Sequence, residues 1–347
     1  MIHNTEEEDS MNKKLVLFII IVSILTVGLF AGGAKETKEE KPITLRYAHV
    51  GVATEIQTRY AEEVAKAVQE RTKGRLVIQV FPNSQLGGVS EMVDGVKAGT
   101  IDMAHHDFAS LGKFLTDVSV FNAPYIYRDE EHAIKATNPK TSPVLRELNE
   151  KLIQAAGIRI IGSHYRGARQ LSANYPVYSP ADMKGKKFRG VPVKLWMTML
   201  EGMGAIPTPV EIAELHTALM TGVVVGQENP LQNIYAQRFY EVQTHIMMTS
   251  HMHSVLCTFI NEKSWQKIPE STRAIFEQVL QDKALESLKW TAEADKDIRA
   301  KLEEKGMKFI DTSNGLKLDE FRTAVLNKVF QDFPQWKTYI EQIQAIK

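Results

Sequence analysis

Cysteine is almost absent from this chain of 347 residues, and neither sign of charge is in excess. Cys257 is the only cysteine, so no internal disulfide can form and stability has to come from packing. Basic and acidic residues number 42 each. This balance gives no reason to expect nucleic acid or an anionic membrane surface as a partner.

The sequence also lacks the local motifs of common catalytic sites. No serine or cysteine elbow and no glycine-rich phosphate loop follows a strand pattern. His251 and His253 share one strand face, but no third acid or histidine lies beside them at ligand spacing. The neighbours His105 and His106 would point to opposite faces of a strand, so they cannot share a metal through its geometry. We therefore expect no catalytic residue, no metal and no cofactor, with a metal-dependent hydrolase using these histidines as the alternative.

The first 34 residues have the order of a secretory signal. Lys13 and Lys14 precede an apolar run of 16 residues, Leu15 to Phe30, which ends in small residues. The acidic residues before Met11 are unusual for a signal, so a start at Met11 is expected. The apolar run is short for a bilayer span, which favours cleavage over a retained anchor. We expect residues 1–34 to be a signal peptide, residues 35–42 a linker, and the mature protein, with a net charge of +2, to be periplasmic.

Strand and helix patterns alternate in the next part of the chain. The expected elements are a strand at 43–48, a helix at 55–72, a strand at 75–81, a helix at 91–98 and a strand at 101–105. This order implies a mainly parallel sheet flanked by helices. Ligands of such sheets lie beyond the carboxyl ends of the strands, which here are followed by His49–Val50, Gln85–Gly88 and His106–Asp107.

The second half of the chain repeats this alternation and ends in helices. We expect strands at 158–162, 187–191, 223–226 and 247–260, and helices at 195–203, 211–220, 321–330 and 336–346. Residues 272–305 contain no proline or glycine and predict one helix of about 50 Å, longer than a single lobe.

Three polar residues, Arg169, Arg189 and Asn229, lie at turn-rich junctions between these elements. Two guanidinium groups close together form a fork for a planar anion such as a carboxylate. An asparagine nearby adds a donor and an acceptor for a second oxygen. Most arginines are surface ion-pair partners, so spacing alone does not decide between the two roles.

Motifs around these residues decide it. The features are Arg169-Gln170, Asp182-Met-Lys-Gly185 with Phe188-Arg189, Gly204-Ala205 with Pro207, Thr217-Ala-Leu219, Gly226-Gln-Glu-Asn-Pro230 and Phe239-Tyr-Glu-Val242, preceded by Phe81-Pro82, Gln85-Leu-Gly87, Gly99-Thr-Ile-Asp102 and Val120-Phe121 with Pro124-Tyr125. In this order and at these separations they resemble the substrate-binding proteins of tripartite ATP-independent periplasmic (TRAP) transporters, the DctP family, which capture organic acids outside the inner membrane. The resemblance covers residues 43–347.

The resemblance implies an α/β, two-lobed periplasmic-binding-protein fold. Each lobe would hold a mostly parallel sheet flanked by helices, and the long helix would span both lobes. The first lobe would comprise residues 43–165 plus about 253–294, and the second residues 166–252 plus about 295–347.

The resemblance also implies a function without catalysis. Arg189 would bind the substrate carboxylate, Arg169 and Asn229 would orient it, and Asp107 would accept hydrogen bonds from hydroxyls. Trp196, His216 and His49 are further candidates for the cleft, although Trp196 could equally be a core residue. Asp107, His216 and Trp196 suggest a cleft for hydroxyls and a ring, which favours sugar acids such as hexuronates or aldonates over C4-dicarboxylates. The expected partners are the small acid and the TRAP membrane permease, and we expect a monomer.

The chain departs from the family pattern near the expected ligand. Val225 precedes Gly226 where the family usually has aspartate, His216 stands where an aromatic residue is common, and Gly190 separates Arg189 from the Val-Pro pair. The preferred acid therefore cannot be copied from any one family member. An alternative output, ligand sensing for a membrane kinase, is not separated from transport by the sequence.

Overall fold

Two alternating apolar runs form the first pair of parallel strands in the computed structural model, which describes residues 41–347. Strand β1 (Ile43–Ala48) pairs in parallel with β2 (Leu76–Phe81), and helix α2 (Ile56–Arg71) connects them. Leu45 and Tyr47 of β1 are buried with Tyr60 and Val64 of α2. The expected signal peptide and most of the expected linker lie outside the described residues.

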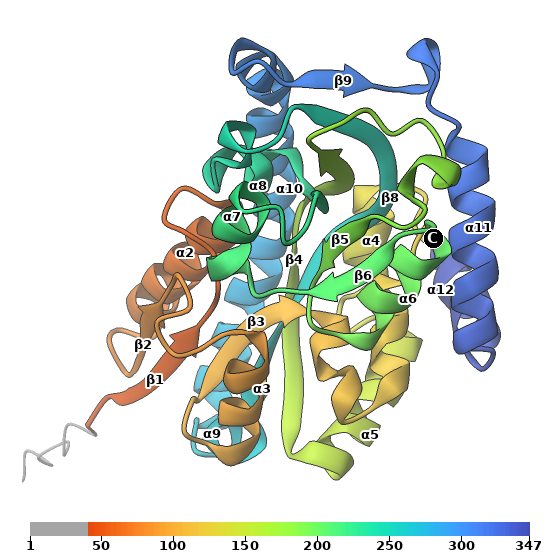
Figure 1. Ribbon diagram of the computed structural model, residues 1–347. Coiled ribbons are helices and arrows are strands. Elements are labelled where there is room, and N and C mark those ends of the chain that lie inside the picture. The colour runs from red at the N-terminus through yellow and green to blue at the C-terminus, as the bar shows by residue number, and fades with distance from the viewer. Residues whose placement is uncertain (1–40) are drawn as a thin grey trace, which may run out of the picture. The chain divides into compact units, whose positions relative to one another are not determined.

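One sheet of nine strands runs through the described part of the chain (Figure 1). The other strands are β3 (Met103–Asp107), β4 (Ile158–Ala173), β5 (Lys187–Gly190), β6 (Ile206–Pro209), β7 (Gly226–Pro230), β8 (His245–Asn261) and β9 (Lys308–Ile310). Their order is β2-β1-β3-β8-β4-β7-β5-β6, and β9 pairs with β8. β1 pairs in parallel with β2 and β3, and β5 with β6 and β7, so the predicted α/β class with a mostly parallel sheet is confirmed.

The two long strands at the centre connect the parallel groups. β4 and β8 pair antiparallel along most of their length, while β3 joins β8 on one side and β7 joins β4 on the other. The register of β4 against β8 shifts at three places, one of them between Tyr165 and Ala168. Such irregularities bend and twist a strand.

Helices cover both faces of this sheet (Figure 1). They are α3 (Val89–Ala98), α4 (Glu130–Ala136), α5 (Pro143–Ala156), α6 (Lys194–Gly202), α7 (Ile212–Met220), α8 (Leu231–Ala236), α9 (Glu262–Gln266), α10 (Glu270–Glu304), α11 (Leu318–Asp332) and α12 (Trp336–Gln344). At 35 residues, α10 is the expected long helix and spans about 50 Å. It packs against β4, and the Ser287 hydroxyl of α10 accepts a hydrogen bond from the backbone amide of Tyr165 in β4 at 3.0 Å.

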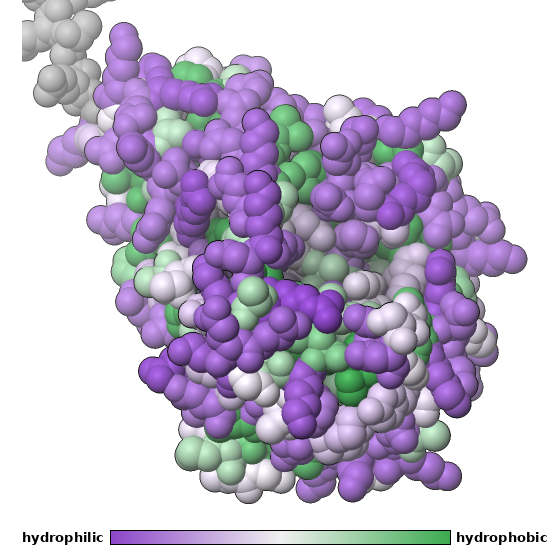
Figure 2. All heavy atoms as spheres, turned by 90° about the horizontal axis from the view of Figure 1, so that it is seen from above, coloured by the Kyte–Doolittle hydropathy of each residue, from purple (hydrophilic) through white to green (hydrophobic). Residues whose placement is uncertain are grey.

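One face of the described part is mostly polar. Figure 2 shows a face on which hydrophilic side chains predominate and apolar ones form small groups. Within residues 41–347, every helix is too short or too polar to serve as a membrane span.

Three of the predicted strands differ clearly from the sequence-based expectation, and β6 and β9 were not predicted. The strand predicted at 158–162 continues to Ala173, because the chain stays paired with β8 through its irregularities. The strand predicted at 223–226 begins at Gly226 instead, is buried throughout, and has three polar residues at its centre, Gln227, Glu228 and Asn229. The strand predicted at 101–105 lies two residues later, so Asp107 ends β3 rather than following it.

Gly226 is required where β7 meets β5. A Cβ at this position would lie 2.3 Å from Cε1 of Phe188 and 2.7 Å from the carbonyl oxygen of Ser172. Real side chains do not approach this closely, so only glycine lets β7 pack between β4 and β5. The close fit aligns the polar residues of β7 with Arg169 on β4.

Candidate functional site

Strands β4, β7 and β8 bring Arg169 into a fully buried polar network. Arg169 is 0 % exposed, and its guanidinium binds both carboxylate oxygens of Glu228, with Nη2 2.7 Å from Oε1. The same Nη2 donates to Oδ1 of Asn229 at 3.1 Å. Because the guanidinium is engaged by protein acceptors, Arg169 fixes Glu228 and Asn229 in place.

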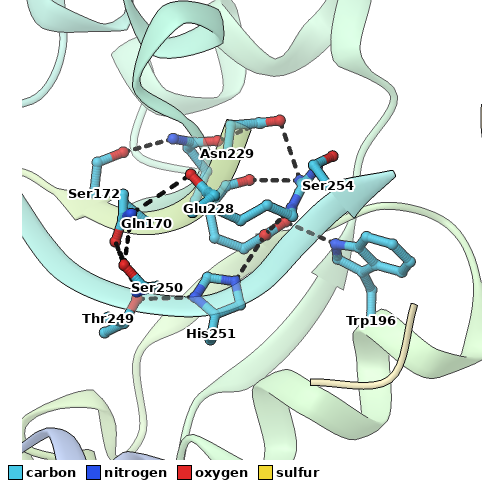
Figure 3. Close-up of polar contacts among 12 residues, drawn as sticks. Gln170, Ser172, Trp196, Glu228, Asn229, Thr249, Ser250, His251 and Ser254 are labelled. Carbon is cyan, nitrogen blue, oxygen red and sulfur yellow. Dashed lines mark hydrogen bonds and ion pairs between the residues drawn. The ribbon is translucent and has the colours of Figure 1, made fainter. Parts of the chain in front are cut away.

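Glu228 is the centre of this network (Figure 3). Its carboxylate also accepts from Nε1 of Trp196 at 2.7 Å and from Nε2 of His251 at 3.0 Å. Burial raises the pKa of Glu228, but the charge and hydrogen bonds of Arg169 and the bond from His251 outweigh it and lower the pKa to about 2. Glu228 is therefore ionised and balances the buried charge of Arg169.

His251 enters the network as a neutral donor. Burial lowers the pKa of His251, and Glu228 opposes this shift only in part. A neutral imidazole that donates from Nε2 to Glu228 must accept at Nδ1, where the Thr249 hydroxyl lies at 2.8 Å. The tautomer is thus set by its two neighbours.

Arg189 differs from Arg169 in having no acidic partner. It ends β5, is 2 % exposed, and donates from Nε to the Val210 carbonyl oxygen at 2.8 Å. Among residues 41–347 no carboxylate lies within ion-pair distance of it, and its terminal nitrogens donate to no protein acceptor. Burial lowers the pKa of Arg189 to about 10. A buried guanidinium without an anion is costly, and a bound carboxylate would remove that cost.

Asp107 provides a free acceptor at the end of β3. It is 1 % exposed, and neither carboxylate oxygen has a hydrogen-bond partner in the described chain. The Nδ1 atom of His106 lies 3.6 Å from Oδ2 of Asp107. Two unpartnered oxygens at a buried site are suited to ligand hydroxyl donors.

The pKa of His106 shows that these groups lie near one another. Burial lowers this pKa to about 4; Asp107 opposes the shift, and the charges of Arg166, Arg169 and Arg189 add to it. The charges of three arginines on β4 and β5 are therefore felt at the end of β3.

A pocket of about 290 Å³ opens beside this cluster. Its lining includes Ala109 and Ser110, which follow Asp107, and Pro192, Val193 and Leu195, which follow Arg189. Ser110 is buried with no hydrogen-bond partner for its hydroxyl. The pocket thus lies between the segments that follow Asp107 and Arg189, although neither of these two residues is part of its lining.

The other predicted site residues are placed differently. Trp196 is fully buried, and its indole N–H donates a hydrogen bond to Glu228. His49 stacks on His105 with ring centroids 4.6 Å apart, and burial lowers its pKa to about 4. His216 lies on α7, partly exposed, with Nε2 3.3 Å from Glu241. Hydrogen bonds through Glu228 and Arg169 join Trp196 and Asn229 into one network. Within residues 41–347, no hydrogen bond or ion pair connects Arg189, Asp107, His49 or His216 to that network.

Sequence reasoning missed four residues of this network. Glu228 was visible only as part of the Gly226–Pro230 motif, and His251 only as a possible metal ligand. Arg166 and Ser254 carried no role at all. The position of Arg166, three residues before Arg169, was the one signal available in the sequence. No group of three potential metal-ligating side chains occurs within residues 41–347.

Comparison with known proteins finds periplasmic binding proteins of similar sequence and fold. The chain is 29 % identical over 335 residues to the 2,3-diketo-L-gulonate-binding periplasmic protein YiaO of Escherichia coli, covering 93 % of this chain and 98 % of that protein. A TRAP periplasmic solute-binding protein of Roseobacter denitrificans, solved with bound L-galactonate, superposes with a TM-score of 0.80 at 27 % identity, covering 87 % of this chain and 98 % of that one. Another, from Sulfurospirillum deleyianum with bound succinate, has a TM-score of 0.77 at 26 % identity, covering 88 % and 99 %.

These relatives are binding proteins of transport systems. Residues 47–333 match the family model described as bacterial extracellular solute-binding protein, family 7. That match includes β3, β4, β5, β7 and β8, and so every strand that carries the polar cluster. The chain belongs to this family, the DctP-type solute-binding proteins of TRAP transporters.

Proposed function

We propose that this protein captures an organic acid, a sugar acid in preference to a C4-dicarboxylate, and delivers it to a TRAP membrane permease. The observation that carries the proposal is Arg189, a buried guanidinium with no anion of its own. Its terminal nitrogens present the parallel donors that a carboxylate accepts. Arg169 and Asn229 orient the carboxylate rather than bind it as the main partner, because each already has protein partners.

Hydroxyl recognition favours sugar acids. Asp107 has two buried oxygens that accept from no protein donor, and a polyhydroxylated ligand would satisfy them. Succinate would leave both without a partner. Two of the three relatives described above bind or contain sugar acids, with hexuronates and aldonates as the first candidates here. The protein itself performs no chemistry on its ligand, and we expect it to act as a monomer.

The ligand would lie between two lobes. We assign residues 43–165 with about 253–294 to the first lobe and the remainder of 166–347 to the second, with α10 along both. Contacts between the lobes support a closed arrangement: Glu55 accepts from Asn233 at 2.9 Å and from Gln237 at 2.7 Å. The Val89 amide lies 3.4 Å from a carboxylate oxygen of Glu211.

Ligand binding is expected to reduce the radius of gyration. Hinge bending near residues 163–167 and 250–255 would open the lobes when the cleft is empty and close them on the acid. Solution scattering with and without a saturating sugar acid measures this change. An identical radius of gyration in the two states would contradict a closing cleft.

Export is expected to remove the first 34 residues. The mature protein should begin near Lys35 and be released from the periplasm by osmotic shock, because the apolar run is short and ends in small residues. The intact mass of the released protein checks this. A mass that still includes Leu15–Phe30 would contradict cleavage.

The ligand itself can be identified directly. Protein purified from its native periplasm without added ligand is denatured, and the released small molecules are analysed by mass spectrometry. A hydroxylated carboxylic acid in stoichiometric amount is the expected result. Recovery of a neutral or cationic compound in that amount would overturn the proposal.

A further inference from the structure

Arg166 is a second buried guanidinium that the role of Arg189 does not explain. It is 9 % exposed, and its Nε donates to the Ser254 hydroxyl at 3.0 Å. Within residues 41–347 no carboxylate lies within ion-pair distance of it, and its terminal nitrogens donate to no protein acceptor. Burial lowers the pKa of Arg166, and the charge of Arg169 lowers it further.

A local irregularity in β4 directs Arg166 toward the cluster. Residues three apart on a regular strand point to opposite faces. Here the register shifts between Tyr165 and Ala168, and Gly167 adopts φ +109°, a conformation that side chains rarely allow. As a result Arg166 and Arg169 both reach Ser254, at 3.0 Å and 3.5 Å. The backbone is thus built to place both guanidinium groups on one side of the strand.

The two arginines on β4 have different partners. Glu228 and Asn229 engage Arg169, whereas Arg166 has only a serine hydroxyl. Asp107 lies opposite Leu256 on β8, two residues from the Ser254 that Arg166 contacts. Its charge raises the pKa of Arg166, as the charges of Glu55 and Glu228 do, and it also raises the pKa of Arg189. The cluster therefore offers two guanidinium forks and one carboxylate that no protein group within residues 41–347 binds.

We infer that the ligand is a hydroxylated dicarboxylate, a sugar acid with a carboxylate at each end. Arg189 binds one carboxylate, Arg166 binds the other, and Asp107 accepts from hydroxyls of the carbon chain. A monocarboxylate satisfies one fork and leaves the second guanidinium buried without an anionic acceptor. A plain dicarboxylate leaves Asp107 without donors. This inference rests on the proposed function and narrows it.

Galactarate and galactonate test the inference, because they differ only in the last carbon, a carboxylate in one and a hydroxymethyl group in the other. Calorimetric titration of the wild-type protein should give a dissociation constant for galactarate that is lower by about tenfold or more. This comparison requires no variant. Equal or tighter binding of galactonate would overturn the inference while leaving the proposed function intact.

Substitution then locates the effect. Arg166→Gln should weaken galactarate by about 30-fold or more and galactonate much less, because the second carboxylate loses its partner. Arg166→Lys keeps the charge but not the paired donors, and should recover only part of the loss. Arg299→Gln, on the exposed face of α10, is the matched control and should change neither constant.

Two results would contradict the inference, and only the second would also contradict the proposed function. Equal weakening of both acids by Arg166→Gln would make Arg166 a merely structural residue and overturn the inference. Failure of both acids, and of hexuronates and succinate, to bind the wild-type protein would overturn the proposed function and the inference together.

Discussion

Replacement of Arg189 by alanine is expected to weaken binding of the sugar acid by about 30-fold to several thousand-fold. The loss of one member of a buried, hydrogen-bonded charge pair costs on the order of 2–5 kcal/mol, and each 1.4 kcal/mol is about tenfold in dissociation constant. Arg189 is buried and has no anionic protein partner, so its two terminal nitrogens are available to the ligand carboxylate. Calorimetric titration with the best-binding acid measures the change.

Two variants separate the fork from the charge. Arg189→Lys keeps a positive charge but cannot donate two parallel hydrogen bonds, so its affinity should fall nearly as far as that of the alanine variant. Arg299→Ala removes an exposed arginine that pairs with Glu303, and it should leave affinity unchanged. Near-wild-type affinity of the Arg189→Ala protein, with normal thermal unfolding, would remove Arg189 from the site.

Glu228→Gln is expected to reduce the free energy of unfolding by about 3–5 kcal/mol at pH 7. The substitution keeps the size of the side chain but leaves Arg169 as a buried charge without a counter-ion. Chemical denaturation measures the loss. Glu303→Gln on the surface of α10 is the control, and it should cost at most about 1 kcal/mol. A difference between Glu228→Gln and wild type no larger than the control's would contradict the role of Glu228.

The same pair predicts how stability depends on pH. The pKa of Glu228 is about 2 in the folded protein, below its ordinary value of 4.5, so the folded state binds its proton less readily than the unfolded state does. Its contribution is present in full above pH 4.5 and is lost as the pH falls toward 2. In the Glu228→Gln protein this part of the acid destabilisation should be missing. Parallel pH profiles of the two proteins would contradict it.

Local patterns in the sequence were sufficient for the fold class and for many individual elements. The helix at Glu270–Glu304 and the strands at Ile43–Ala48 and Leu76–Phe81 follow from apolar spacing and from the lack of proline or glycine. Strand β7 could not be placed in this way, since its residues are polar and buried. These polar residues can be buried because Arg169, 59 positions away from Glu228 in the sequence, supplies the charge and hydrogen bonds that Glu228 needs.

Some members of the polar cluster could be proposed from the sequence, but the roles of Glu228 and His251 and the connections between residues could not. Arg169 and Arg189 look alike in the sequence, yet one is paired with Glu228 and the other is unpaired. That distinction depends on which strand lies beside each arginine, a long-range property that spacing does not contain. Arg166 was overlooked because the strand was expected to end at residue 162, so nothing indicated that Arg166 and Arg169 share one strand. The irregularity at Gly167 lets both of them reach Ser254.

A crystal structure of the protein with a bound sugar acid tests the central claim most directly. We predict that a ligand carboxylate accepts two hydrogen bonds from Arg189, each of about 2.7–2.9 Å, while ligand hydroxyls donate to Asp107. Arg169 should remain paired with Glu228, and the lobes should be closed around the acid. A ligand bound outside this cluster, or an Arg189 whose terminal nitrogens bind a protein carboxylate in the complex, would contradict the account.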